Sequence, residues 1–352
     1  MKEEYGSIRP SERFWIDLQP FLLERGYKLR PRYDPNWAPS WKKSWNFKST
    51  VSCEDSMSFL YPRILDAVRV NDGTKVVLRK ANIHEDIPVL EYLNSPELLA
   101  DPRNNTVRVL DVIPLPYDRD FALIVMPMLY HFDSHLTPFR HVSEVLEALE
   151  QFIYGLAFLH EHQIAHRDAC YFNLMMDPTK VIPSGFHFVL NHLQDDVKTQ
   201  VIYNDRRSVA PVKYYFIDYE TADRFEPGEK CLGMIGQNRT VPEMSPTVPY
   251  DPFKVDVYQL GSVIPRLIEY YEGLELLKPL GDAMTDKDPE KRLTASESGQ
   301  KFQELVSPLT EAELSQKIWL RRLSPEDRMI VGFPIETPFW VKFLESLFCC
   351  CC

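Results

Sequence analysis

Apolar residues recur at helical spacing over residues 142–159, and the rest of the chain is organised around this stretch. The residues that carry the pattern are Val142, Val145, Leu146, Leu149, Phe152, Ile153, Leu156 and Leu159. Because such spacing places the side chains along one face, it predicts a long amphipathic helix. A more polar segment, residues 163–173, follows the helix directly and is expected to be a loop.

Shorter apolar runs predict strands on both sides of this helix. Residues 64–70 and 75–79 flank the turn sequence Asn71-Asp72-Gly73, which predicts a β-hairpin. Further strands are predicted over residues 107–112, 121–126, 174–177 and 213–218. A β-rich first part followed by a helical second part indicates the α+β class, with a small strand-rich lobe and a larger helical lobe.

The residues before the hairpin form an N-terminal extension that is rich in proline and tryptophan. A short helix is predicted over residues 12–25, and an extended segment follows it. We expect Trp15, Trp37 and Trp41 to dock on the main body, because large aromatic side chains are usually buried. A peptide-binding role for these tryptophans is the alternative.

Composition restricts the class of protein. The 352 residues carry a formal charge of −11, which argues against nucleic acid or an anionic membrane surface as the main partner. No apolar run is long enough to span a bilayer, and the acidic start of the chain is not a signal peptide. The seven cysteines have neither disulfide-framework nor zinc-ligand spacing. We therefore expect a reduced, cytoplasmic, soluble protein.

The loop after the long helix carries a recognisable set of polar residues. It contains His166, Arg167 and Asp168, with Asn173 five positions after the aspartate. This spacing resembles the catalytic loop of protein kinases, H-R-D-L-x-x-x-N. The apolar helix upstream strengthens the resemblance.

Further segments resemble kinase motifs in the same order along the chain. Asp218-Tyr219-Glu220 follows an apolar strand and resembles D-F-G, and Val241-Pro242-Glu243 resembles A-P-E. Residues 256–261 are similar to the start of the central helix, D-x-W-S-L-G, and residues 288–293 to the D-P-x-x-R segment. Each motif is weak alone, but their order and spacing together predict the bilobal protein-kinase fold. Some details are similar to divergent kinase-like proteins of fungi.

The resemblance implies a phosphotransfer site that uses ATP and Mg²⁺. Asp168 would accept the proton of a substrate hydroxyl, while Asn173 and Asp218 would hold Mg²⁺ through hard oxygen ligands. Arg167 would meet a phosphate on the activation segment, for which Thr221 and Thr240 are both candidates.

The resemblance also implies where the nucleotide binds. In the strand over residues 75–79, Val77 takes the position beside the adenine and Arg79 the position of the phosphate-binding lysine. A shift of one residue would present Lys80 instead, and the apolar pattern fits both registers. Met126 would be the gatekeeper, residues 127–131 the hinge with Met128, and Met175 part of the strand under the nucleotide.

Several features depart from the kinase pattern. No glycine lies between Gly26 and Gly73, so the phosphate-binding glycine loop is missing. Asp86 aligns with the glutamate that pairs with the lysine, but Pro88 predicts a short helix that begins after Asp86. Cys170 replaces the lysine that follows the catalytic aspartate, and Glu220 adds negative charge near the metals. These changes predict weak ATP binding and slow turnover.

Some motif residues are expected to be structural. We expect His166 to pack in the core, Asp256 to hydrogen-bond the backbone of the catalytic loop, and Cys170 to fill space rather than act as a nucleophile. Glu243 and Arg292 are expected to form a buried ion pair.

The motifs divide the chain into four regions. Residues 1–43 are the extension, 44–126 the first lobe, 127–310 the second lobe with an insertion at 178–212, and 311–352 a C-terminal extension. The insertion is either a packed irregular loop or a docking surface. The tail ends in Cys349 to Cys352, whose acylation would attach the protein to a membrane; an unmodified tail is the alternative.

Two functions from different classes follow. The first is an ATP- and Mg²⁺-dependent transfer of phosphate to Ser or Thr of a protein substrate. The second is a pseudokinase that binds partner proteins without turnover. A small-molecule kinase is a more distant third, because Glu243 and Arg292 belong to the protein-kinase pattern.

Overall fold

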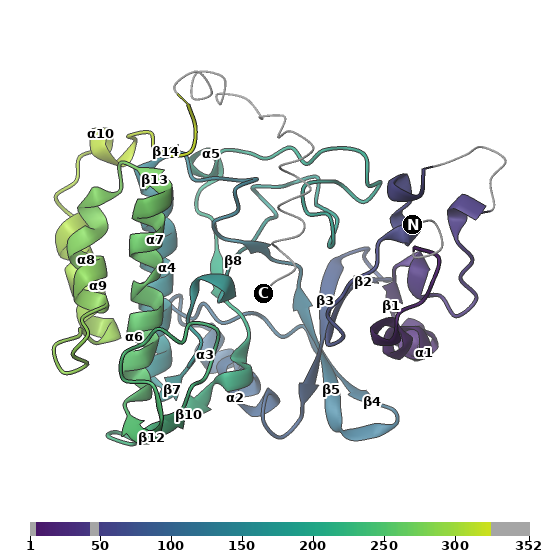
Figure 1. Ribbon diagram of the computed structural model, residues 1–352, viewed down its shortest axis with the longest axis horizontal. Coiled ribbons are helices and arrows are strands. Elements are labelled where there is room, and N and C mark those ends of the chain that lie inside the picture. The colour runs from purple at the N-terminus through teal and green to yellow at the C-terminus, as the bar shows by residue number, and fades with distance from the viewer. Residues whose placement is uncertain (1–4, 43–48, 325–352) are drawn as a thin grey trace.

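The computed structural model describes residues 5–42 and 49–324, which form a mixed α/β protein. Figure 1 shows a curled antiparallel sheet with α1 beside it and, across from the sheet, a larger and mainly helical body. We call these two regions the sheet part and the helical part.

The elements follow the chain in that order. The sheet part contains α1 (Pro10–Glu24), β1 (Tyr27–Leu29), β2 (Ile64–Arg69), β3 (Lys75–Asn82), α2 (Ile87–Leu93), α3 (Pro96–Leu99), β4 (Asp111–Leu115) and β5 (Asp118–Pro127). The helical part contains β6 (Tyr130–His131), α4 (Val142–Glu161), β7 (Ile164–Ala165), β8 (Leu174–Met176), α5 (Arg206–Val209), β9 (Tyr214–Phe216), β10 (Asp223–Arg224), β11 (Cys231–Gly233), β12 (Ser245–Tyr250), α6 (Pro252–Gly261), α7 (Val263–Tyr270), β13 (Tyr271–Glu272), α8 (Lys278–Met284), α9 (Ala295–Val306), α10 (Glu311–Leu314) and β14 (Trp319–Leu320).

The five strands of the main sheet have the order β1-β2-β3-β5-β4, with β3 at the centre. Successive side chains of a strand point to opposite faces, so β3 contributes to two separate cores. Val76 and Leu78 pack with the α1 side, while Val77 and Ala81 pack with the helical part. The sheet is therefore covered on both faces.

The α1 helix is a docked part of the molecule, as the tryptophan pattern predicted. Trp15 is buried against the sheet, and its indole N–H donates to the carbonyl oxygen of Pro62 at 3.1 Å. The Glu12 carboxylate accepts the Arg9 N–H at the start of the helix. It also pairs with Arg32 at 2.5 Å, and both side chains are buried.

The predicted hairpin is formed by β2 and β3. Gly73 has φ +73°, a left-handed conformation that a side chain disfavours, and its N–H donates to the carbonyl of Arg69. The register pairs Ile64 with Arg79 and Asp66 with Val77.

The strand predicted over residues 107–112 is wrong for residues 107–110. The strand β4 begins only at Asp111, and the N–H of Val107 donates to the carbonyl of Phe216 in β9. Val107 is buried in the larger core, where it bonds to β9 and not to the main sheet, whereas Leu110 is 41% exposed. Alternating apolar residues predict a strand but not the partner with which it pairs.

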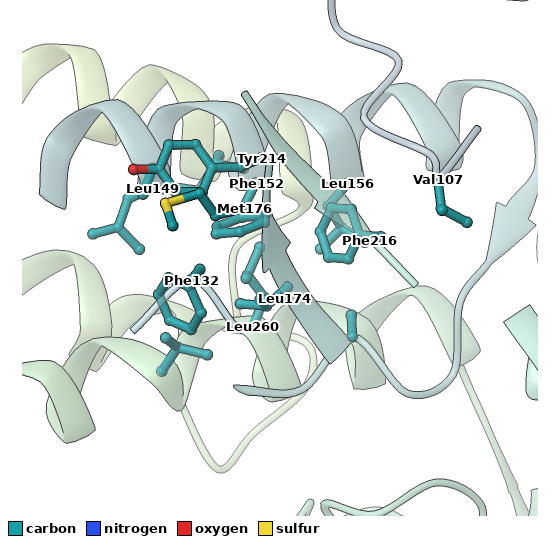
Figure 2. Packing of buried hydrophobic residues seen from close by; sticks show 14 of the residues in the cluster. Val107, Phe132, Leu149, Phe152, Leu156, Leu174, Met176, Tyr214, Phe216 and Leu260 are labelled. Atoms are coloured by element: carbon teal, nitrogen blue, oxygen red, sulfur yellow. The ribbon is translucent and has the colours of Figure 1, made fainter. Parts of the chain in front are cut away.

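The helix α4 confirms the predicted amphipathic helix and forms the centre of the larger core. Figure 2 shows its Leu149, Phe152 and Leu156 facing the strands β8 and β9. The ring of Phe152 lies 5.5 Å from that of Phe216 and 5.6 Å from that of Tyr214. Burial of one such aromatic side chain contributes about 1.5–3 kcal/mol to the free energy of folding. The packing of α4 therefore stabilises the strands that flank the candidate loop.

The insertion is a packed irregular loop for most of its length. Val181, Ile182 and Phe186 are buried, and Phe186 packs edge-on against Tyr130 with ring centroids 4.7 Å apart. The ammonium of Lys75 donates to the Phe186 carbonyl at 2.8 Å. The insertion therefore ties the beginning of β3 to the helical part.

None of the helices in the described residues is both long enough and apolar enough to cross a membrane. The C-terminal cysteines for which acylation was considered lie outside the described residues.

Candidate functional site

The loop between β7 and β8 is held by one buried carboxylate. Asp256 of α6 accepts the N–H of His166 at 2.8 Å and the N–H of Arg167 at 2.6 Å. It also receives a hydrogen bond from His160 at 3.0 Å, and it has no exposed surface. Arg167 has φ +61°, a disfavoured conformation for a side-chain-bearing residue. The predicted structural role of Asp256 is confirmed.

Asp168 is buried, and both of its carboxylate oxygens accept hydrogen bonds. The amide of Asn173 donates to Oδ2 at 2.8 Å, and the backbone N–H of Gln237 donates to Oδ1 at 2.8 Å. Only 4% of the residue is exposed. The structure thus brings the candidate base Asp168 together with Asn173, which was predicted as a metal ligand. Residues of the segment before Val241 cover the other oxygen of Asp168.

Gly236 makes this cover possible. A Cβ atom at this position would lie 2.6 Å from Oδ1 of Asp168 and 2.7 Å from the carbonyl oxygen of Arg167. The residue also has φ +80°. Only glycine combines this backbone conformation with so close an approach.

Pairing of β8 with β9 brings the second predicted metal ligand to the same place. Leu174 pairs with Phe216, and the N–H of Ile217 donates to the carbonyl of Asn173 at 3.0 Å. Asp218 follows with φ +64°, which turns the chain sharply at the end of the strand. Asn173 and Asp218 therefore lie at the same end of two neighbouring strands.

A chain of four charged side chains joins the sheet part to this end. Arg79 donates from Nη2 to Oδ1 of Asp218 at 2.8 Å and to Oε2 of Glu220 at 2.9 Å. Arg63 donates to the other oxygen of Glu220 at 2.5 Å. The Arg79 side chain is mostly buried, whereas those of Asp218 and Glu220 are 36% and 44% exposed.

The register of β3 excludes Lys80 as the cation of this site, which corrects one of our two alternatives. Lys80 lies on the α1 face, with its ammonium 4.2 Å from the ring centroid of Phe121 and 3.5 Å from Asp118. Arg79 lies on the opposite face with Val77. The sequence did not decide between Arg79 and Lys80, because the apolar pattern of this strand is compatible with either register.

Asp86 does not pair with Arg79. It immediately precedes α2, as Pro88 predicted, and its carboxylate accepts the N–H of Asn82 at 2.7 Å. Burial raises the pKa of this carboxyl above its ordinary value, because the charged form loses water. The ion pair considered from the sequence is replaced by the Arg79 contacts with Asp218 and Glu220.

The residues expected beside the adenine lie together on the inner face of the sheet. Val77 pairs with Met126, and both belong to the core shared with the helical part. Met128 follows two residues later and is buried, while Met175 of β8 is half-buried. Pro127 ends β5 at the predicted hinge and supplies no backbone donor there.

Two oxygen atoms fit the hard ligand set that Mg²⁺ prefers. The Asn173 amide uses its nitrogen for both hydrogen bonds to Asp168, and Asp218 uses Oδ1 for Arg79. Across residues 5–42 and 49–324, Oδ1 of Asn173 and Oδ2 of Asp218 have no hydrogen-bond partner. One amide and one carboxylate oxygen are therefore available to a divalent cation.

His166 and Tyr219 form a buried scaffold behind the site. The Asp168 N–H donates to Nδ1 of His166 at 3.3 Å, so Nε2 carries the proton and donates to the carbonyl of Ile217. The ring of Tyr219 packs 4.7 Å away, and its hydroxyl donates to Thr106 at 3.1 Å. Burial raises the pKa of this phenol well above its ordinary value. The structural role predicted for His166 is confirmed.

Cys170 is a buried filler, as predicted. Burial, together with the neighbouring Asp168 carboxylate, raises the pKa of its thiol to about 12. A thiol protonated at neutral pH is a poor nucleophile.

Arg167 lies in the loop before β8 and contacts the segment that contains Thr221 and Thr240, the two candidate phosphorylation sites. Its guanidinium carbon is 5.6 Å from the ring centroid of Phe225, and its Nε is shielded from solvent with no hydrogen-bond partner in the described residues. The hydroxyl of Thr221 donates to the carbonyl of His166, whereas Thr240 is exposed and donates to Asn238. Thr240 is therefore the more accessible of the two hydroxyls.

The predicted Glu243–Arg292 ion pair is formed and bidentate. Nη1 and Nη2 of Arg292 each contact one oxygen of Glu243, the second at 2.9 Å. The Arg292 guanidinium is fully buried, and it also donates to the carbonyls of Asp286 and Lys254. The Glu243 side chain keeps 12% of its surface exposed.

Three contributors were missed by sequence reasoning. Arg63 contacts Glu220, and the N–H of Gln237 contacts Asp168. Neither contact has a sequence signature, since Arg63 precedes β2 and Gln237 lies in an irregular segment. Gln259 accepts the N–H of Ala169 at 3.0 Å and lies three residues after Asp256 on α6. This spacing places both side chains on one helical face and was a usable signal.

Known protein families and curated proteins were compared with the chain, and neither comparison finds a match.

Proposed function

We propose that this protein has a bilobal protein-kinase-like fold and transfers the γ-phosphate of ATP to a Ser or Thr hydroxyl of a protein substrate, slowly and with Mg²⁺. One observation carries the proposal. Arg79 of the sheet part contacts Asp218 of the helical part at 2.8 Å, across 139 positions of sequence. The cation and the metal ligand named from separate motifs are thus in direct contact, beside the cluster of Asp168 and Asn173.

The available ligands support ATP–Mg²⁺ as the cofactor. Bound there, it would supply the transferable phosphoryl group together with the metal's positive charge. Oδ1 of Asn173 and Oδ2 of Asp218 are the oxygens that would hold Mg²⁺, and Arg79 is the cation nearest to them. Val77, Met126, Met128 and Met175 provide the apolar surroundings expected for an adenine.

Asp168 would act as the general base of this reaction. Its Oδ1 accepts the Gln237 N–H, and a movement of residues 236–237 would make this oxygen accessible to a substrate hydroxyl. The amide of Asn173 would hold Oδ2 and keep the carboxylate oriented while Oδ1 takes the proton.

Slow turnover follows from three features of the site. Glu220 shares the Arg79 guanidinium with Asp218, which reduces the positive charge available to a phosphate. Cys170 is neutral where a lysine would stabilise the transferred group, and the glycine loop is missing. Loss of a single electrostatic contact of this kind typically costs about 3 kcal/mol of barrier, or about a hundredfold in rate.

The alternative, a pseudokinase that binds a protein partner, is favoured by one observation. Asp168 is buried, and both of its carboxylate oxygens accept hydrogen bonds from the protein itself. In this conformation the candidate base is therefore already hydrogen-bonded and is not exposed to a substrate hydroxyl. A cytoplasmic location, with membrane attachment only through an acylated C-terminal tail, belongs to either version of the proposal.

The test combines a thermal-shift titration with ATP, with and without Mg²⁺, and an assay for transfer of radiolabelled phosphate. We expect stabilisation by ATP only when Mg²⁺ is present. Asp218→Asn should abolish this stabilisation, and Asp168→Asn should retain it while label transfer is lost. Asp223→Asn is the matched control, because Asp223 is exposed and lies five residues from Asp218.

The outcomes separate the two functions. A Mg²⁺-dependent shift with label transfer supports the phosphotransferase. A shift without transfer under any condition supports a nucleotide-binding pseudokinase. No shift at millimolar ATP together with no transfer contradicts the enzyme and leaves the binding module.

A further inference from the structure

A cavity of about 660 Å³ opens on the helical part, away from the contact between Arg79 and Asp218. Its wall combines the segment after β6, the loop residue Tyr171, the end of α7 and the residues around β14. The volume falls within the range of about 300–1,000 Å³ that is typical of ligand sites. The function proposed above assigns nothing to this cavity.

Arg266 of α7 dominates the wall of the cavity. Its guanidinium carbon lies 3.7 Å from the ring centroid of Tyr171 and 5.3 Å from those of Phe172 and Tyr270. Among the residues that the structure describes, no carboxylate is within ion-pair distance of Arg266, and its Nε is shielded without a hydrogen-bond partner. A guanidinium stacked on aromatic rings keeps its N–H groups in its own plane, where they suit a carboxylate or phosphate.

Asp133 is one of the two carboxylates of the wall, and it is hydrogen-bonded to two phenols. Asp133 accepts the hydroxyl of Tyr171 at 2.9 Å and the hydroxyl of Tyr271 at 2.6 Å. Burial and the neighbouring Asp133 raise the pKa of both phenols, which therefore remain donors at neutral pH. These two hydrogen bonds stabilise the Asp133 carboxylate, and no ion pair joins it to Arg266 among the described residues.

The remaining charged residues of the wall are Arg321, Arg322 and Glu269. Arg321 and Arg322 line the cavity with Arg266, and Arg321 also pairs with Glu275 at 2.5 Å. The other carboxylate of the wall is Glu269, an exposed residue of α7 three positions after Arg266. The wall of the cavity therefore combines aromatic rings with three arginines and two carboxylates, and Arg266 forms no ion pair within the described residues.

We propose that this cavity binds an acidic segment of another protein, with a carboxylate side chain of that segment on Arg266. The size favours a peptide, since a single small anion would fill only a fraction of the volume. The ring of Tyr270 is 40% exposed and provides a surface on which the aliphatic stem of a glutamate side chain packs. The proposal goes beyond the phosphotransfer proposal and holds for an active enzyme and for a binding module alike.

The cavity adjoins the loop that contains Asp168. Tyr171 is part of its wall and lies three residues after Asp168 in the same loop. A partner held on Arg266 would therefore lie next to the segment that carries the candidate base. In this position an acidic partner protein would be either a substrate of the site or a ligand that contacts the loop.

The test is the fluorescence anisotropy of a rhodamine-labelled glutamate peptide titrated with the full chain at low salt, with the matching glutamine peptide as the neutral control. We expect the glutamate peptide to bind and the glutamine peptide not to bind. Arg266→Gln should weaken binding at least about tenfold, as for the loss of a charge-assisted bidentate contact. Arg224→Gln is the matched control, because Arg224 also stacks on a tyrosine, Tyr92, but lies on β10 at the opposite end of the helical part (Figure 1).

A second variant guards against a folding defect in Arg266→Gln. Glu269→Gln removes the exposed carboxylate of the wall, and it should tighten binding of the glutamate peptide, a gain that unfolding does not produce. Equal binding of both peptides, unchanged binding by Arg266→Gln, or no gain with Glu269→Gln overturns the proposal. Full displacement of the peptide by an equal concentration of inorganic phosphate also overturns it, because the site would then be one for small anions.

Discussion

Arg79 and Asp218 are joined by a 2.8 Å hydrogen bond from Nη2 to Oδ1, and the same nitrogen also reaches Glu220 at 2.9 Å. One guanidinium from the sheet therefore serves two carboxylates of the helical part. Because Asp218 is the candidate metal ligand, any change in Glu220 alters the charge that Arg79 offers there. This shared contact makes the electrostatics of the site directly testable.

Glu220→Gln is expected to strengthen binding of ATP–Mg²⁺, because it removes one negative charge and releases Arg79. The Glu220 side chain is 44% exposed, so solvent screens the pair and the gain is expected to be modest, about two- to fivefold in Kd. The measurement is isothermal titration calorimetry with ATP at fixed Mg²⁺. Weaker binding by Glu220→Gln would show that Glu220 contributes to the nucleotide site instead of competing with it.

The register of β3 predicts different effects for two neighbouring cations. Arg79→Gln should remove most of the Mg²⁺-dependent stabilisation by ATP, because Arg79 faces Asp218. Lys80→Gln is its matched control and should leave that stabilisation intact, since Lys80 lies on the α1 face near Phe121. Thermal-shift titrations of the two variants side by side decide the point, and a larger loss in Lys80→Gln would contradict the assignment.

The ion pair between Glu243 and Arg292 is expected to be structural. Removing one partner of a buried pair typically costs about 3–5 kcal/mol of unfolding free energy, because the other charge loses its compensation. Arg292→Ala should cost more than Glu243→Ala, since Arg292 is fully buried and also donates to two backbone carbonyls. Urea denaturation measures both.

Exposed neighbours provide the controls for that experiment. Glu290→Ala and Lys291→Ala lie in the same segment as Arg292, and each should change stability by no more than about 0.5 kcal/mol. If Glu243→Ala and Arg292→Ala were as stable as these controls, the pair would have no structural role.

Asp256→Ala is expected to disrupt the candidate loop. It would leave the N–H groups of His166 and Arg167 without an acceptor in a buried environment, at about 1–3 kcal/mol for each group. Hydrogen exchange followed by mass spectrometry should show faster exchange over residues 163–173. Asp282→Asn, on an exposed surface of α8, is the control. Unchanged exchange in Asp256→Ala would mean that other contacts hold the loop.

Cys170 is expected to resist alkylation in the folded protein at pH 9 and to react after unfolding. Its thiol pKa is about 12 in the folded state against an ordinary value of 9.0, so the unfolded state releases the proton first as pH rises. The stability that depends on the protonated thiol is therefore fully present below pH 9 and is lost between about pH 9 and 12. Iodoacetamide labelling with peptide mass spectrometry checks the first statement. In denaturation curves across this pH range, Cys170→Ala should lose less stability than the wild type.

Local patterns determined most of the elements. The helical spacing over residues 142–159 predicted α4, and Asn71-Asp72-Gly73 predicted the turn between β2 and β3, because both signals depend on neighbours a few residues apart. Pro88 likewise predicted where α2 begins. The strand over residues 107–112 was an exception, since alternating apolar residues do not reveal that Val107 bonds to β9 and that β4 begins only at Asp111.

The sequence predicted which residues belong to the candidate site but not which of them contact one another. Sequence spacing placed Asp168 and Asn173 in one loop and marked Asp218 after a strand, because the chemistry of each motif is local. It left Arg79 and Lys80 equivalent, since an alternating strand fits either face until its neighbours are known. The contact of Gln237 with Asp168 had no signal at all.

The tertiary structure decided which distant groups meet. Arg79 with Glu220, and Gln237 with Asp168, are separated by 141 and 69 positions, and no periodicity extends over such distances. The hollow around Arg266 likewise forms only where α7, β14 and the loop containing Tyr171 come together. The sequence by itself specified the local conformations and the chemical groups of the site. Packing of the two hydrophobic cores decided which of these groups meet. Burial determines which face of each helix or strand points inward, and the distances between charged side chains follow only when those faces are packed together.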